Sequence, residues 1–136
     1  MNLPVNWGTC IVEHTILVVD DEQEVRTLLT LVLKRAGFRV LTSENGEEAL
    51  AVMEANPYPN LVITDVMMPR MDGLSLCREV RSRAHLADTP LMVISALRDS
   101  KTIEQCDALR VNRFLAKPIK HTELISEVRS LLGAVS

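Results

Sequence analysis

Two patterns of apolar and polar residues alternate along the chain. Short apolar runs such as "ILVV" at 16–19, "LVIT" at 61–64 and "LMVI" at 91–94 lack polar alternation. Such runs are typical of parallel strands that helices cover on both faces. Between the runs lie longer segments whose apolar residues stand three and four positions apart, which is the spacing of one helix face. The pattern therefore predicts strands that alternate with helices.

Five strand-and-helix units follow from this alternation. The expected strands cover 16–20, 38–42, 61–64, 91–95 and 113–116, and the expected helices cover 22–36, 47–55, 74–83, 101–109 and 122–132. Gly37 and Gly133 follow the first and last helices, where glycine commonly ends a helix. Strict alternation with right-handed crossovers predicts an α/β domain with a doubly wound parallel sheet and helices on both faces.

The length and composition fit a single domain. A chain of 136 residues, of which 47% are hydrophobic, can bury one substantial core but not two. Residues 1–14 contain Pro4 and Gly8 and have neither period, so we expect an irregular lead-in there. Residues 15–134 are then the folded domain.

Charge and cysteine content narrow the classes of function. A net charge of −3 offers no basic surplus for direct binding of nucleic acid. The three cysteines, Cys10, Cys77 and Cys106, form no C-x-x-C pair, which argues against a disulfide framework and a zinc site. No apolar run is long enough to span a membrane, and the start of the chain lacks the order of a secretory signal. We therefore expect a soluble cytoplasmic protein without membrane contact.

Chemically active side chains follow four of the five expected strands. Asp20 and Asp21 come at the end of the first strand, Asp65 follows the third, Ser95 ends the fourth and Lys117 follows the fifth. Taken alone, each has an ordinary explanation, such as a helix cap, a turn residue or a solvated lysine. Because the carboxyl ends of parallel strands meet at one edge, where α/β sheets bind ligands, their joint occurrence predicts a shared site.

Three carboxylates at one edge need a counter-charge. At about 4 Å, two such charges repel by roughly 4 kcal/mol at the effective dielectric of a protein surface. A divalent cation would relieve this repulsion. Hard oxygen ligands with no histidine among them suit Mg²⁺ better than zinc.

Four motifs in this order resemble the response-regulator receiver domain of two-component signalling. They are "VVDDE", "LVITDVMMPRMDG", "VISA" and "FLAKP", and the resemblance spans about residues 15–134. It implies a five-stranded sheet of the flavodoxin-like type with strand order 2-1-3-4-5, and a domain that is not a conventional enzyme. It also implies that Asp65 accepts a phosphoryl group from the phosphohistidine of a histidine kinase or a histidine phosphotransfer protein. The modified domain would then control an output domain or effector partner outside this chain.

The resemblance assigns roles to further residues. Mg²⁺ would be held by the carboxylates of Asp20, Asp21 and Asp65 and by the backbone carbonyl of Met67, while Lys117 would contact the phosphoryl oxygens.

Switching is assigned to a second group of residues. Ser95 would donate a hydrogen bond to the phosphoryl group, and Phe114 would turn inward behind it. The peptide bond between Lys117 and Pro118 is expected to be cis.

Several positions depart from the family pattern. Arg110 and Val111 replace the usual Gly-Ala, so a left-handed backbone at Arg110 would carry strain that glycine avoids. Asn112, Arg113 and "KPI" replace the acidic residues and "KPF" of relatives with winged-helix output domains. The symmetric dimer of those relatives, through the fourth helix, fifth strand and fifth helix, is therefore not supported.

The two positions that tune hydrolysis in the family are apolar here. Met67 lies two residues after Asp65, and Leu97 lies two residues after Ser95. Neither side chain can orient an attacking water molecule, which predicts slow self-dephosphorylation.

Two other functions compete with this interpretation. An aspartate-nucleophile phosphatase on a similar sheet would need a second aspartate two residues after the nucleophile, where this chain has Met67. A degenerate receiver would act as a docking module without phosphorylation. The presence of all the expected site residues argues against the degenerate form.

Overall fold

A computed structural model describes residues 14–55, 58–96 and 99–133 of the chain. In this part of the chain, five parallel strands form one sheet in the order β2-β1-β3-β4-β5, as the sequence predicted. The strands are β1 (Thr15–Val19), β2 (Arg39–Ser43), β3 (Leu61–Thr64), β4 (Leu91–Ser95) and β5 (Arg113–Ala116). The helices are α1 (Gln23–Arg35), α2 (Gly46–Glu54), α3 (Gly73–Ser82), α4 (Ser100–Ala108) and α5 (His121–Leu132).

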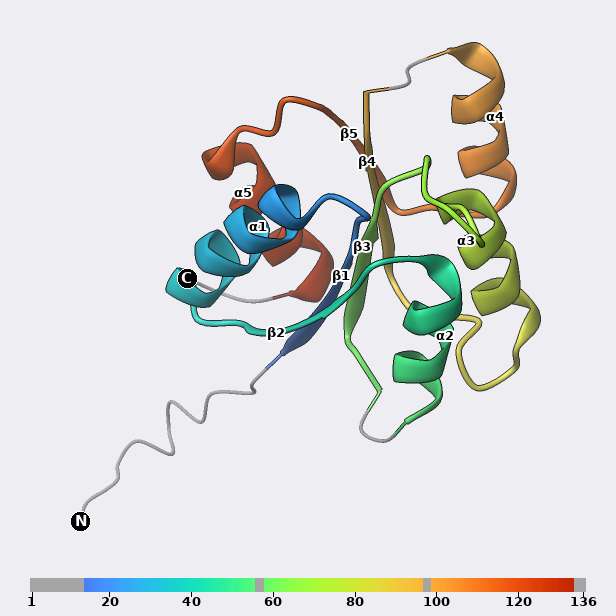
Figure 1. Ribbon diagram of the computed structural model, residues 1–136, viewed down its shortest axis with the longest axis horizontal. Helices are drawn as coiled ribbons and strands as arrows, with labels where there is room; N and C mark the ends of the chain where they lie inside the picture. Colours follow the sequence, from blue (N-terminus) through green and yellow to red (C-terminus); the bar gives the residue numbers. More distant parts are fainter. Residues whose placement is uncertain (1–13, 56–57, 97–98, 134–136) are drawn as a thin grey trace.

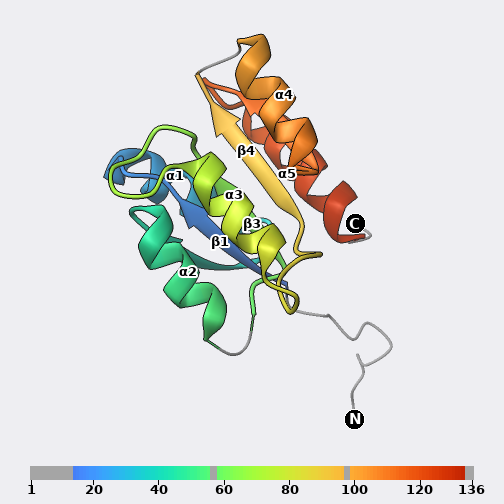
Figure 2. The same ribbon diagram turned by 90° about the vertical axis from the view of Figure 1, so that its right-hand side faces the viewer.

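The helices form one layer on each face of the sheet. Helices α1 and α5 lie on one face, and α2, α3 and α4 lie on the other (Figure 1). In the view turned by 90°, the second group stands in front of the strands (Figure 2). This three-layer arrangement confirms the doubly wound fold.

Alternate residues of the central strands supply the two cores. In β1, Leu17 and Val19 pack with buried residues of α2, α3 and α4. Their neighbours Ile16 and Val18 pack on the opposite face with buried residues of α1 and α5. All residues of β3 and β4 are buried, whereas the edge strand β2 is largely exposed. Burial on both faces explains the continuous apolar runs and fixes the central strands that carry the site.

The element boundaries agree with the predicted ones to within one residue at nearly every end. Three helices are preceded by a polar N-cap residue whose side chain accepts a backbone N–H of the first turn. These residues are Asn45 for α2, Asp72 for α3 and Asp99 for α4. Of the ordinary explanations for the residues at the strand ends, a helix cap does not apply to Asp21, because Glu22 occupies the N-cap position of α1 and makes no side-chain capping bond. The carboxylate of Asp21 is thus left for the site.

Arg110 keeps the left-handed conformation, with φ of 57°, although it is not glycine. Within the described residues, none of the helices has the length and apolar character needed to span a bilayer. The expected irregular lead-in at 1–14 lies outside the described residues except for residue 14.

Candidate functional site

Parallel pairing of β1 with β3 brings Asp20 next to Asp65. Val19 and Thr64, the last residues of the two strands, are partners in the register. The N–H of Asp65 donates to the carbonyl of Val19 at 3.1 Å. Both aspartates therefore leave the carboxyl edge of the sheet at the same level.

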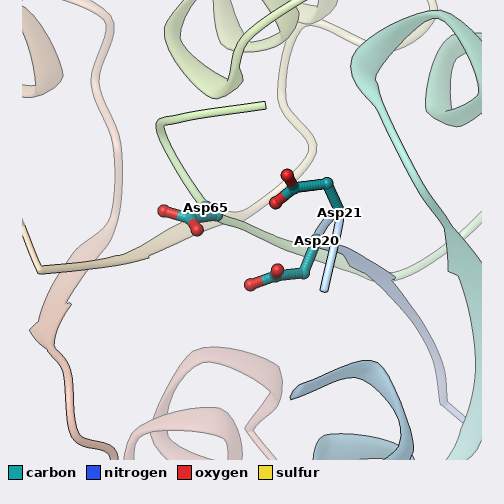
Figure 3. Close-up of side chains that lie close together, drawn as sticks. All are labelled: Asp20, Asp21 and Asp65. Atoms are coloured by element: carbon teal, nitrogen blue, oxygen red, sulfur yellow. The ribbon is translucent and has the colours of Figure 1, made fainter. Parts of the chain in front are cut away.

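Asp20, Asp21 and Asp65 form an acidic cluster at this edge. Their carboxylates can place one oxygen each within 4.8 Å of one another. Figure 3 shows the three side chains together at the ends of β1 and β3. Asp20 and Asp65 are 3% and 9% exposed, whereas Asp21 is open to solvent. The cluster has a buried base and an accessible rim, which a bound cation or phosphoryl group would require.

Lys117, which follows β5, bridges the two buried carboxylates. Its Nζ atom lies 2.9 Å from Oδ2 of Asp65 and 3.2 Å from Oδ2 of Asp20. Glu22 contributes a longer contact of 3.7 Å. From the sequence, only a metal ion was expected to balance the charge of the three carboxylates, but Lys117 balances part of it. Three clustered carboxylates facing one ammonium still leave an excess of negative charge that favours a cation.

The burial of these groups alters their proton affinities. Loss of solvent raises the pKa of Asp20 above its ordinary value, although the Glu22 N–H and the Lys117 ammonium act against this increase. Burial alone would lower the pKa of Lys117, but its hydrogen bond to Asp65 and the charge of Asp20 outweigh that effect and raise it. Lys117 is therefore a permanent cation at neutral pH.

Backbone groups fix the orientation of the two buried carboxylates. The N–H of Glu22 donates to Oδ1 of Asp20 at 2.9 Å, and the N–H of Val66 donates to Oδ1 of Asp65 at 2.6 Å. In each aspartate one oxygen is held by the backbone and the other by Lys117. Such fixed orientation lowers the cost of arranging the groups when a ligand binds.

Two residues that support the site were missed in the sequence. The guanidinium of Arg26, in α1, donates to the backbone carbonyl of Asp20 at 2.6 Å. At Gly73 an added Cβ would lie 1.8 Å from the carbonyl oxygen of Asp65, so only glycine fits. The "MDG" motif signalled a turn at Gly73, but the close approach to Asp65 depends on the folded path of the chain.

The remaining predicted residues lie on β4, on β5 and in the loops that follow β3 and β5, except for one that the structure does not describe. Ser95 is buried at the end of β4, and its carbonyl accepts the N–H of Lys117 at 3.1 Å. Phe114 is partly buried against the core under α2, α3 and α4. The Met67 side chain is 64% exposed, and the Lys117–Pro118 bond is cis as expected. Leu97 lies outside the described residues.

Comparison with known proteins identifies the class to which this fold and site belong. The family model described as response regulator receiver domain matches residues 16–129. The chain therefore belongs to the response regulator receiver domain family. Its place in two-component signalling is that of a phosphoacceptor domain rather than a conventional enzyme.

Particular relatives agree with this assignment. The chain is 39% identical over 117 residues to the probable transcriptional regulator ycf27 of Cyanophora paradoxa, covering 86% of this chain and 47% of the relative. It is 42% identical over 123 residues to the response regulator MprA of Mycobacterium sp. (strain KMS), covering 89% and 51%. The chain thus spans about half the length of the curated relatives it matches.

Solved structures share the fold. A putative response regulator from Chloroflexus aurantiacus superposes with a TM-score of 0.84 at 35% identity, covering 90% of this chain and 99% of that one. The chemotaxis protein CheY4 of Vibrio cholerae superposes with a TM-score of 0.83 at 26% identity, covering 89% and 100%.

Proposed function

We propose that Asp65 is the phosphoacceptor of this domain and that a histidine kinase or a histidine phosphotransfer protein is its donor. The observation that carries the proposal is the convergence of three carboxylates within 4.8 Å, with Lys117 2.9 Å from Asp65. A carboxylate oxygen of Asp65 would attack the phosphorus atom, the bond from phosphorus to the histidine nitrogen would break, and the freed imidazole would take a proton. Carboxylates serve as nucleophiles in such covalent transfers.

Lys117 and the acidic residues divide the remaining work. Lys117, already in contact with Asp65, would pair with a phosphoryl oxygen once the new bond forms. Asp20, Asp21, Asp65 and the carbonyl of Met67 would hold Mg²⁺, since the donor set consists of hard oxygens at one open edge. The bound ion would offset the negative charge that spreads over the transferring group.

Ser95 and Phe114 are proposed to convert phosphorylation into a change of shape. Ser95 lies on the strand next to Lys117, so a phosphoryl group on Asp65 could draw its hydroxyl toward the site. A hydrogen bond to a charged group contributes about 1.5–3 kcal/mol, which shifts a two-state population by roughly tenfold to a hundredfold. Phe114, packed against the neighbouring core, would move inward with it.

The output of this switch is proposed to reach a domain or protein outside the chain. The net charge of −3 offers no basic surplus for direct binding of nucleic acid by this chain. The free, buried thiols of Cys77 and Cys106 suit the reducing cytoplasm in which such signalling operates.

The phosphorylated state is proposed to decay slowly. The exposed side chain of Met67 lacks a group that could hold a water molecule in line with the phosphorus atom. We expect Met67→Asn combined with Leu97→Glu to lose the phosphoryl group faster than the wild type, as followed by the decay of labelled protein. An unchanged decay rate would contradict this explanation.

Beryllofluoride, a mimic of the phosphoryl group, provides the test of the proposed function. Addition of Mg²⁺ and beryllofluoride to the wild type should shift the NMR signals of the backbone amides around Asp65, Ser95 and Lys117. Asp65→Asn should show no such response while keeping its fold. Absence of any response in the wild type, together with no labelling of Asp65 by a phosphorylated donor, would favour a docking module that works without phosphorylation.

A further inference from the structure

The first turn of α2 contacts the loop that follows the acceptor strand. This loop, residues 66–72, joins β3 to α3. Gly46, the first residue of α2, donates its N–H to the carbonyl oxygen of Met71 at 3.0 Å. A Cβ added to Gly46 would lie 2.8 Å from that oxygen and 2.7 Å from Cγ of Met71. Atoms this close overlap, so only glycine permits the observed approach.

The same turn of α2 makes a second contact with the loop and is itself anchored. Arg70, which has a left-handed φ of 67°, places Nη1 3.4 Å from Oε1 of Glu47. The buried side chain of Asn45 caps the turn by accepting the N–H of Glu48 at 2.9 Å. The exposed ion pair adds little energy by itself. The capped turn and the Gly46 contact are therefore the main support on this side.

The two ends of the loop meet next to the acceptor itself. Gly73 donates its N–H to the carbonyl of Val66 at 2.9 Å, and its lack of a side chain lets it lie against the backbone of Asp65. The segment that carries the Met67 carbonyl is thus held at one end by Asp65 and at the other by α2. A displacement at Met71 must change the path of the residues between these two points.

We propose that Gly46 is a positioning residue of the phosphoacceptor site. Its contact with Met71 sets the path of loop 66–72 and thereby the place of the Met67 carbonyl relative to the three aspartates. Gly46 touches neither the metal nor the phosphoryl group in this scheme, and it acts through the backbone of Met71. The inference rests on the proposed function, because the Met67 carbonyl is a proposed ligand of Mg²⁺.

The direct test compares Gly46→Ala with the matched substitution Gly37→Ala. Alanine favours helix more than glycine does, so local helix propensity alone would make Gly46→Ala harmless or stabilising. We expect instead that Mg²⁺ binding, measured by calorimetry with the metal alone, weakens by about tenfold to a hundredfold, as for other residues that orient metal ligands. Amide hydrogen exchange over residues 66–72 should become faster as well.

Gly37→Ala supplies the control for general loss of stability. Gly37 has a φ of 99° with open space around its Cα, so alanine there is strained without striking any neighbour. It ends α1, at the opposite edge of the sheet from the aspartates. This variant should be less stable than the wild type but should bind Mg²⁺ with unchanged affinity and leave exchange in 66–72 unaltered.

A second pair of variants covers the case in which Gly46→Ala does not fold. Asn45→Ala removes the cap of α2 without adding atoms near Met71, and Asn45→Ser keeps a capping oxygen. We expect Asn45→Ala to weaken Mg²⁺ binding in the same direction as Gly46→Ala, and Asn45→Ser to restore it.

The outcomes separate this inference from the proposed function. Wild-type affinity and exchange in Gly46→Ala would overturn the inference, as would equal losses in Gly46→Ala and Gly37→Ala. If neither Gly46→Ala nor a folded Asn45→Ala changes hydrogen exchange in residues 66–72, the contact has no positioning role. Failure of the wild type to bind Mg²⁺, while Gly46→Ala still accelerates exchange in 66–72, would instead reject the proposed metal site and leave the control of the loop by α2 in place.

Discussion

The ammonium of Lys117 competes with a bound metal ion for the same carboxylate oxygens. Its ammonium contacts oxygens of Asp20 and Asp65, two of the carboxylates that are proposed to hold Mg²⁺. An ammonium and a divalent cation cannot both lie close to the same oxygens without repulsion. Lys117 therefore stabilises the site without metal and opposes the binding of metal.

Replacing Lys117 with methionine should strengthen the binding of Mg²⁺. Two unit charges about 4 Å apart repel by roughly 4 kcal/mol at a surface-like dielectric, and a divalent ion doubles this value. Solvent and salt screen most of it in a partly open site, so we expect an effect of about tenfold in affinity. The same change should abolish phosphoryl transfer, because the pairing group is lost. Calorimetric titration with Mg²⁺ measures the first effect, and labelling from a phosphorylated donor measures the second.

Lys120→Met is the matched control for this prediction. Lys120 is exposed, lies three residues further along the chain, and has the same charge. Its replacement should change Mg²⁺ affinity only slightly, through long-range electrostatics that salt screens. Weaker binding in Lys117→Met than in the wild type would mean that the ammonium organises the carboxylates more than it repels the metal.

Cys77 should be chemically inert in the folded protein. Loss of solvent in the core raises the pKa of its thiol to about 12. The thiolate is the reactive form, so in a Cys10→Ser background a disulfide reagent at pH 8 should label neither Cys77 nor the buried Cys106 until the chain unfolds. The unfolded thiol, with its ordinary pKa of 9.0, ionises first as the pH rises. This difference should lower the stability of the fold above about pH 9. Rapid labelling of Cys77 in the native state would contradict the prediction.

At the scale of elements, the turn between α4 and β5 shows how this chain compensates for an unfavourable residue. Arg110 has a left-handed backbone, which costs a residue with a side chain roughly 1–2 kcal/mol. The guanidinium of Arg81, at the end of α3, donates to the carbonyls of Leu109 and Arg110 at 2.9 Å each. These two hydrogen bonds from a charged donor hold the turn in place.

Arg110→Gly should stabilise the protein by roughly 0.5–1 kcal/mol, because relief of the left-handed strain exceeds the added flexibility of the unfolded chain. The carbonyl that accepts from Arg81 is retained in this variant. Urea denaturation monitored by circular dichroism measures the change. As a control, Arg35→Gly in the last turn of α1 should lower the free energy of unfolding by about 1 kcal/mol. Destabilisation by Arg110→Gly would show that its side chain contributes more than its backbone costs.

The elements themselves could be predicted almost completely from the sequence. Continuous apolar runs identified the buried strands, and the replacement of glycine by Arg110 marked a position where a left-handed backbone would be strained. The role of Arg81 could not be predicted, because its acceptors at Leu109 and Arg110 lie 28 and 29 positions away in the sequence. Single-position errors at the helix ends have a local cause, since capping depends on the orientation of side chains such as Asn45.

At the scale of the whole molecule, topology explains why the site could be predicted before its geometry was known. Parallel strands that alternate with helices must place Asp20, Asp65 and Lys117 at one edge. The bridging position of Lys117 and the contact of Gly46 with Met71 depend on distances between different units of the fold. Residue order alone does not determine those distances. The chemical class of the site therefore follows from topology, whereas the contacts that hold its residues in place do not.

Binding of Mg²⁺ should appear in the stability of the entire domain. A ligand that binds only the folded state raises the free energy of unfolding by about 2.7 kcal/mol at one hundred times its dissociation constant. The wild type should therefore unfold at higher urea concentration as Mg²⁺ is added, and the exposed Asp107→Asn variant should behave like it.

Asp20→Asn should lose this response to Mg²⁺ while being at least as stable as the metal-free wild type. The sign follows from the pKa of Asp20, which burial raises above that of the unfolded chain. A folded acid with a raised pKa is ionised at pH 7 at a cost to stability. That cost shrinks as the pH falls through the folded pKa and is gone below the pKa of the unfolded chain. Removing the carboxylate removes both this cost and one proposed metal ligand. Mg²⁺-dependent stabilisation of Asp20→Asn equal to that of the wild type would place the ion elsewhere on the molecule.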